Sequence, residues 1–132
     1  MSSRALASTK PPVLLIVDDE ARILSALKRA LRREGYEILT ATSPAEALQI
    51  LEQRPVDLVL SDHKMPGMNG DQLLEEVARR CPGVVRMLIT GWTQELSPGR
   101  LEELGVRALI TKPWDDAKLK QTLRRAIEDA ER

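Results

Sequence analysis

Short apolar runs alternate with longer amphipathic segments along most of the chain, and this alternation constrains the fold more than any other feature. The short runs are rich in β-branched residues, which is typical of buried strands. Five such runs predict strands: Val13–Val17, Glu37–Thr42, Val56–Ser61, Val84–Thr90 and Arg107–Thr111. Strands that alternate with helices form parallel sheets with helices on both faces, so the chain is predicted to be an α/β protein of the (βα)5 type.

Helices are predicted between and after these strands, at Glu20–Glu34, from Ser43 to just before Pro55, at Gly70–Cys81, at Thr93–Leu104 and at Asp115–Glu131. The second of them has a clear beginning. Ser43 is a favourable N-cap, Pro44 suits the first helical position, and Glu46 completes a capping box. The fourth is weaker, because Pro98-Gly99 interrupts it, and only its second half is predicted to be well formed.

The size and charge of the chain exclude several classes of protein. Its 132 residues suffice for one domain, and a formal net charge of +0 lacks the positive excess of a dedicated nucleic-acid-binding protein. The longest apolar run, Val13–Val17, is far shorter than the roughly 20 residues of a membrane helix. The N-terminus also lacks the apolar stretch of a secretory signal. We therefore expect a flexible polar tail over residues 1–12 and one cytoplasmic domain over residues 13–132, without direct contact to membranes or nucleic acid.

Polar residues gather where the predicted strands end. Asp18 and Asp19 follow the first strand, Asp62 follows the third, Thr90 ends the fourth, and Lys112 follows the fifth. The carboxyl ends of parallel strands share one edge of the sheet, and ligands of such folds bind there. We therefore expect these five side chains to meet in one site.

The chemistry of this site follows from its charges. Three carboxylates brought together repel one another unless a cation lies between them. A hard divalent ion with oxygen ligands, above all Mg²⁺, suits them, and Mg²⁺ keeps positions open for phosphate oxygens. Lys112 adds a second positive charge that can pair with a phosphoryl group. A carboxylate can itself attack phosphorus and form an aspartyl phosphate. A single cysteine and a single histidine, by contrast, exclude an internal disulfide and the usual cysteine- or histidine-rich metal sites.

Four segments at these strand ends carry a resemblance to a known family: Val17–Glu20, Ser61–Gly70, Thr90-Gly91 and Lys112–Trp114. Together, and in this order, they strongly resemble the receiver domain of two-component response regulators, the CheY-like superfamily. The resemblance covers about Val13 to Glu131. It implies a doubly wound, flavodoxin-like three-layer sandwich whose parallel strands lie in the order 2-1-3-4-5.

The resemblance also implies a role for the acidic residues. Asp62 would be the phosphoacceptor. Mg²⁺ would be bound by the side chains of Asp19 and Asp62 and by the backbone carbonyl of Lys64, while Asp18 would hold a metal-bound water.

Two further residues receive roles from the same resemblance. Thr90 would donate a hydrogen bond to the phosphoryl group, and Lys112 would pair with it. Similar domains also lead us to expect a cis peptide bond between Lys112 and Pro113.

Partners follow from the resemblance as well. A histidine kinase or phosphotransfer protein would donate the phosphoryl group. The fourth helix, fifth strand and fifth helix would then present a changed face to an output domain or downstream protein, and dimerisation through the two helices stays open. Such a domain catalyses only its own phosphorylation at Asp62 and is not an enzyme in the usual sense. The segments around Thr90 and Lys112 are similar to receivers that precede cyclic-di-GMP phosphodiesterase or transcription-activator domains.

Two positions depart from the family pattern. Leu109 stands where the family often has an aromatic residue that moves inward on activation, and we hypothesise that Trp92 or Trp114 gates the site instead. Pro98-Gly99 lies in the fourth helix and is expected to alter its mobility. His63, beside the predicted acceptor, is expected at the surface or rim of the site.

Two other functions remain as alternatives. The first is a phosphorylation-independent docking or dimerisation module, which Leu109 and Pro98-Gly99 leave open although the acidic site argues against it. The second is a small phosphohydrolase with the same aspartate nucleophile. Such enzymes usually need a cap or a further general acid, and the sequence offers none.

Overall fold

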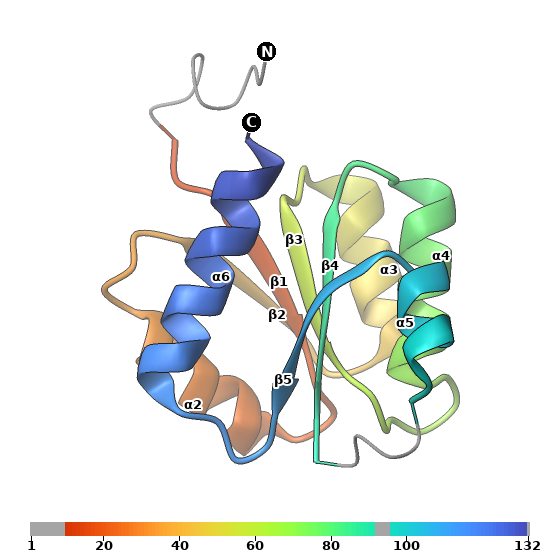
Figure 1. Ribbon diagram of the computed structural model, residues 1–132. Coiled ribbons are helices and arrows are strands. Elements are labelled where there is room, and N and C mark those ends of the chain that lie inside the picture. The colour runs from red at the N-terminus through yellow and green to blue at the C-terminus, as the bar shows by residue number, and fades with distance from the viewer. Residues whose placement is uncertain (1–9, 92–95, 132) are drawn as a thin grey trace.

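The computed structural model describes residues 10–91 and 96–131, and these form one parallel sheet flanked by helices (Figure 1). Five strands lie in the order β2-β1-β3-β4-β5, which confirms the predicted topology. The strands are β1 (Val13–Val17), β2 (Glu37–Ala41), β3 (Leu58–Asp62), β4 (Val85–Thr90) and β5 (Val106–Thr111). The helices are α2 (Ala21–Leu31), α3 (Pro44–Gln53), α4 (Gly70–Arg80), α5 (Pro98–Glu103) and α6 (Asp116–Ala130).

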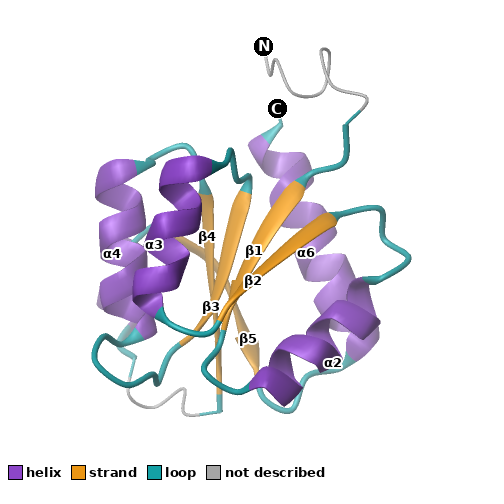
Figure 2. Cartoon of the chain, turned by 180° about the vertical axis from the view of Figure 1, so that it is seen from behind, coloured by secondary structure: helices purple, strands orange, loops and turns teal. Residues whose placement is uncertain are grey.

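Helices cover both faces of the sheet, so the fold has three layers (Figure 2). Alternate residues of each strand point to opposite faces. In β1, Leu14 and Ile16 join the core beneath α2 and α6, whereas Leu15 and Val17 join the core beneath α3 and α4. Burial on both faces explains why the strands are continuous apolar runs rather than alternating ones.

Most predicted helix boundaries hold closely, but α2 ends at Leu31 rather than at Glu34, and the region around Pro98 also differs. Ser43 caps α3 as expected, since its hydroxyl accepts a hydrogen bond from the backbone N–H of Glu46 at 3.1 Å. Pro98 was expected to interrupt a helix, but it begins α5, with Ser97 as the N-cap. Proline lacks an N–H that the first turn would leave unpaired, so it is well suited to that position. The expected first half of this helix includes residues 92–95, which lie outside the described residues.

The chain joins the sheet just before the first strand. The backbone carbonyl of Pro12 accepts a hydrogen bond from Glu37 N–H at 2.9 Å, which extends the pairing of β1 with β2 by one residue. The predicted tail over residues 1–12 falls mostly outside the described residues. Among the described helices, none is both long and apolar enough to cross a membrane.

Candidate functional site

The structure brings the predicted site residues together at the carboxyl edge of the sheet. Asp18 directly follows β1, Asp62 ends β3, Thr90 ends β4, and Lys112 directly follows β5. Asp18 is 0% exposed, Asp62 7% and Thr90 2%, so these polar groups are buried rather than spread over a surface. Burial of several polar groups at one point destabilises a fold unless these groups have hydrogen-bond or charge partners.

Lys112 joins two of the carboxylates. Its Nζ lies 2.9 Å from Oδ2 of Asp18 and 3.0 Å from Oδ1 of Asp62. The other oxygen of Asp18 accepts a hydrogen bond from the backbone N–H of Glu20 at 2.9 Å. The peptide bond between Lys112 and Pro113 is cis, as the resemblance implied. The backbone N–H of Lys112 also donates to the carbonyl of Thr90 at 3.0 Å, which ties the end of β5 to the end of β4.

The charges at the site alter the acidity of two groups. Burial raises the pKa of Asp62, and the nearby Asp18 carboxylate adds to this effect, while the hydrogen bond from Lys112 offsets part of it. Burial opposes the positive charge of Lys112, but its hydrogen bonds to Asp18 and Asp62 outweigh burial, and its pKa is raised. The site therefore holds Lys112 as an ammonium group while disfavouring the negative charge on Asp62.

The acidic residues fit a divalent cation. One carboxylate oxygen from each of Asp18, Asp19 and Asp62 lies within 4.8 Å of the other two. Asp19 is exposed, whereas the other two are buried, so the cluster is open to solvent on one side. Oxygen ligands on one side and access for water or phosphate on the other are what Mg²⁺ requires. Lys64, two residues after Asp62, has an exposed side chain.

A close approach of two backbones supports the end of β3. Gly70 begins α4, and its N–H donates to the carbonyl of His63 at 2.6 Å. A Cβ at Gly70 would overlap the backbone oxygen of Asp62, so only glycine lets α4 pack this closely. Gly67, in the loop between β3 and α4, has a φ of 87°, a conformation that glycine adopts without strain. Sequence reasoning missed the role of Gly70, although glycine at a helix start was a visible signal.

His63 is buried, which corrects the expectation that it lies at the surface or rim. It is 5% exposed and points to the α4 side of the sheet, with Nε2 3.5 Å from Oδ1 of Asp71. The carboxylate of Asp71 also accepts a hydrogen bond from Nε of Arg100, on α5, at 3.3 Å. A residue after a strand end continues the alternation of the strand, and this places His63 opposite Asp62. Nothing in the sequence pairs His63 with Asp71 or Arg100.

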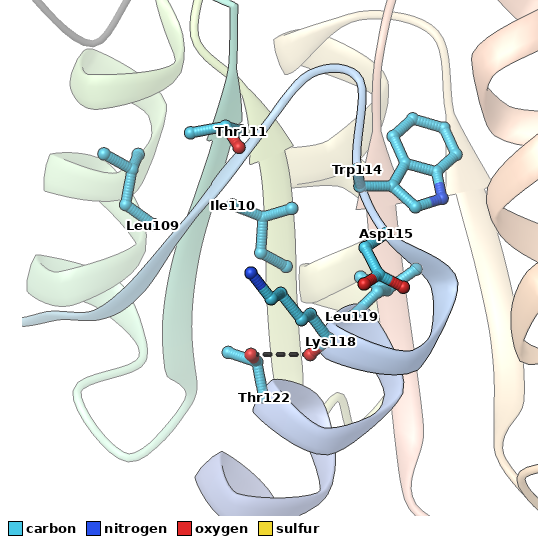
Figure 3. Close-up of a pocket in the computed structure, with 8 residues that line it drawn as sticks. All are labelled: Leu109, Ile110, Thr111, Trp114, Asp115, Lys118, Leu119 and Thr122. Carbon is cyan, nitrogen blue, oxygen red and sulfur yellow. Dashed lines mark hydrogen bonds between the residues drawn. The ribbon is translucent and has the colours of Figure 1, made fainter.

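A small hollow of about 140 Å³ lies between β5 and α6 and is lined by both elements (Figure 3). Ligand pockets usually measure about 300–1,000 Å³, so this hollow is small for a drug-sized molecule. Leu109 is half-buried against the core on the α3–α4 side of the sheet. Trp114 is half-buried too, and its ring N–H donates to Asp116 at 2.9 Å. Trp92, the other tryptophan considered as a gate, lies outside the described residues.

Comparisons with known proteins agree on one family. The response regulator receiver domain family matches residues 14–124. The chain is 40% identical over 123 residues to the hydrogenase transcriptional regulatory protein HoxA of Cupriavidus necator, which covers 92% of this chain and 25% of HoxA. It is 39% identical over 123 residues to the transcriptional regulatory protein GlrR of Escherichia coli, which covers 93% of this chain and 27% of GlrR. It thus spans about a quarter of the length of these relatives.

A solved structure shows the same fold. The CheY-like response regulator receiver domain protein of Methanospirillum hungatei has a TM-score of 0.84 and 31% identity, over 92% of this chain and 98% of that chain. The family match spans β1 to α6 and includes every residue of the acidic site. The chain therefore belongs to the response regulator receiver domains of two-component systems, the CheY-like family.

Proposed function

We propose that this receiver domain accepts a phosphoryl group on Asp62 from a phosphohistidine of a histidine kinase or phosphotransfer protein. The observation that carries the proposal is the position of Lys112, whose ammonium group lies 3.0 Å from the Asp62 carboxylate inside a cluster of three acidic residues. A charged amine beside a buried carboxylate neutralises the charge that a phosphoryl group would bring.

The transfer forms one bond and breaks another. An oxygen of Asp62 attacks phosphorus, and the bond from phosphorus to the donor nitrogen breaks, with its electron pair returning to the donor imidazole. Lys112 stays protonated and pairs with the transferred group, and Thr90 donates its hydroxyl to a phosphoryl oxygen. Mg²⁺, bound through Asp19, Asp62 and the backbone carbonyl of Lys64, with Asp18 on a metal-bound water, would neutralise the remaining phosphoryl oxygens.

The signal leaves through α5, β5 and α6. Pairing Lys112 with a phosphoryl group competes with its present bond to Asp18, which connects the chemistry to the end of β5. Because the relatives HoxA and GlrR are named transcriptional regulatory proteins, we propose an output domain or partner that controls transcription. We further propose that the domain works in the cytoplasm, binds no nucleic acid itself, and turns over no substrate beyond its own acyl phosphate.

Intact mass spectrometry tests this proposal. The chain is incubated with Mg²⁺ and acetyl phosphate, alongside Asp62→Asn and, as a control, Asp129→Asn, which alters an exposed carboxylate on α6 far from the site. We expect one added phosphoryl group on the native chain and on Asp129→Asn. No addition is expected on Asp62→Asn or after chelation of the metal.

A docking module is the second candidate, because Leu109 replaces the aromatic residue often found at this position in receivers. The same experiment separates the two. If neither acetyl phosphate nor a phosphorylated histidine kinase labels the chain while a reference receiver is labelled, Asp62 is not an acceptor. The acidic site would then serve metal binding alone.

A further inference from the structure

Two buried polar atoms near the site lack hydrogen-bond partners among the residues the structure describes: Nδ1 of His63 and Oδ1 of Asp71. A buried polar atom left unpaired destabilises a fold, so such atoms call for an explanation. Both belong to residues that the proposed phosphoryl transfer does not use. Both also lie between the acceptor strand and α5, which makes them candidates for a connection between the two.

The side chains form a continuous polar chain across three elements. Nε2 of His63 lies 3.5 Å from Oδ1 of Asp71, at the beginning of α4. Oδ2 of Asp71 accepts a hydrogen bond from Nε of Arg100 at 3.3 Å. A second nitrogen of the Arg100 guanidinium group donates a hydrogen bond to the carboxylate of Glu75 at 3.3 Å. The chain thus runs from the residue beside Asp62 to α5 without a gap longer than 3.5 Å.

The backbone of His63 is held on both sides, so its ring is the part able to move. Its N–H donates to the carbonyl of Ile89 at 3.2 Å, and its own carbonyl accepts from Gly70 at 2.6 Å. The peptide plane that it shares with Asp62 is therefore anchored to β4, and the next plane, which it shares with Lys64, is anchored to α4. Asp62 and His63 are thus adjacent residues on a backbone that is held by both β4 and α4.

Arg100 connects α5 to α4. The helix has six residues, and none of these is fully buried, although Leu96 and Leu104 on either side are buried and Leu101 packs partly against the core. The ion pairs of Arg100 with Asp71 and Glu75 join the middle of α5 to α4. A short helix with few buried residues of its own can respond to a small change in such contacts.

We propose that His63 is a positioning residue that couples Asp62 to α5 through Asp71 and Arg100. The inference rests on the proposed function, because the event it transmits is the arrival of a phosphoryl group at Asp62. That group adds negative charge to the residue before His63 and shifts the strand end that holds it, and this changes the preferred position of the His63 ring. The contact of Nε2 with Oδ1 of Asp71 is not a hydrogen bond, and Nδ1 of His63 has no partner among the described residues, so a rearrangement of the ring breaks no hydrogen bond between the two residues.

Coupling of this kind is reciprocal, so a substitution on α5 must alter the affinity of the Asp62 site for a phosphoryl analogue. The test measures the affinity for beryllofluoride, which mimics an aspartyl phosphate, in the presence of Mg²⁺. It uses His63→Leu, Arg100→Gln and the double variant. Each single variant is expected to change the dissociation constant by about 2- to 30-fold, the range typical of residues along a coupling path. The double variant is expected to match the larger single effect rather than the product of the two.

Arg79→Gln provides the matched control. It removes the same charge from an exposed pair with Glu76 on α4, outside the chain of contacts. In the double variant that combines Arg79→Gln with His63→Leu, the fold-changes of the two single variants in the dissociation constant are expected to multiply. If the effects of His63→Leu and Arg100→Gln also multiply, there is no coupling and the inference is overturned. If the native chain fails to bind beryllofluoride at all, the proposed function itself is wrong, which is a distinct result.

His63 is buried, so His63→Leu could fail to fold. A second variant and a second measurement therefore test the same coupling without it. Asp71→Asn keeps the shape of a partly exposed side chain and replaces His63→Leu in the same cycle with Arg100→Gln. In parallel, the ¹⁵N resonance of Arg100 Nε is followed during beryllofluoride titration. We expect this resonance to shift in the native chain and to stay in place in Asp71→Asn, although amides next to Asp62 still move. An equal shift in both proteins contradicts the inference.

Discussion

The Nζ atom of Lys112 lies 3.0 Å from Oδ1 of Asp62, although Asp62 ends β3 and Lys112 follows β5. The same Nζ atom lies 2.9 Å from Asp18, so one ammonium group balances two buried carboxylates. We therefore expect Lys112 to affect both the stability of the metal-free domain and the proposed phosphorylation of Asp62.

Lys112→Ala is expected to destabilise the metal-free domain. The substitution leaves the carboxylates of Asp18 and Asp62 buried without their ammonium partner, which costs about 1–3 kcal/mol. Mg²⁺ restores part of the loss, because it supplies positive charge to the same carboxylates. Urea unfolding with and without Mg²⁺ measures both effects. Lys118→Ala, an exposed lysine on α6, is the control and should change little.

The same variant should also slow phosphorylation. Loss of the Lys112 charge removes a preorganised partner for the phosphoryl oxygens, and we expect the rate with acetyl phosphate to fall roughly 10- to 100-fold. The rate is followed by intact mass at saturating Mg²⁺. An unchanged rate in a folded variant would show that Lys112 has only a structural role.

Asp62→Asn is expected to stabilise the metal-free domain. Burial raises the pKa of Asp62, so its charged form is unfavourable in the fold at neutral pH. Asparagine keeps the shape without the charge, and we expect a gain of about 1 kcal/mol, or roughly 2–4 °C in Tm. Thermal unfolding in the presence of a chelator measures the gain.

The gain should depend on pH in one direction. Because the folded-state pKa of Asp62 lies above its ordinary value of 3.8, the native chain is most favoured below that value and loses stability as pH rises through the folded pKa. Asparagine does not titrate. The advantage of Asp62→Asn should therefore be small near pH 4 and reach a plateau toward neutral pH. An advantage that shrinks as pH rises would mean that the pKa of Asp62 is lowered instead.

Gly70→Ala should disturb the acceptor strand. Its methyl group would overlap the backbone oxygen of Asp62, so α4 or the end of β3 must shift. Overpacking of this kind costs about 1–3 kcal/mol. We expect lower stability in urea and slower phosphorylation of Asp62. Gly83→Ala is the matched control, because a Cβ at that position meets no atom within 4 Å. Equal behaviour of the two variants would show that the close approach is not required.

Gly99→Ala should stabilise α5. Gly99 lies in the helix, and a Cβ there also meets no atom within 4 Å. Alanine in a helix is favoured over glycine by about 0.5–1 kcal/mol. Amide hydrogen exchange is expected to show slower exchange in α5 and no change in α3. Faster exchange in α5 would mean that glycine serves a contact the described residues do not reveal.

The sequence by itself determined the (βα)5 arrangement and the members of the acidic site. Strands and helices follow from local periodicity, as the match of β1 with its predicted range shows, and the cap of α3 follows from the residue types at its beginning. Asp18, Asp62, Thr90 and Lys112 could be grouped because the ends of parallel strands share one edge of a sheet.

Only the tertiary structure decided which of these residues touch and what lies behind them. It placed Lys112 between Asp18 and Asp62, buried His63, and connected Asp71 to Arg100. It also showed that Pro98, which was expected to interrupt a helix, is the first residue of α5. These contacts join residues distant in sequence, and they depend on how closely each helix packs on the sheet. Local patterns record the period of an element and its buried face, but not the distance between two elements.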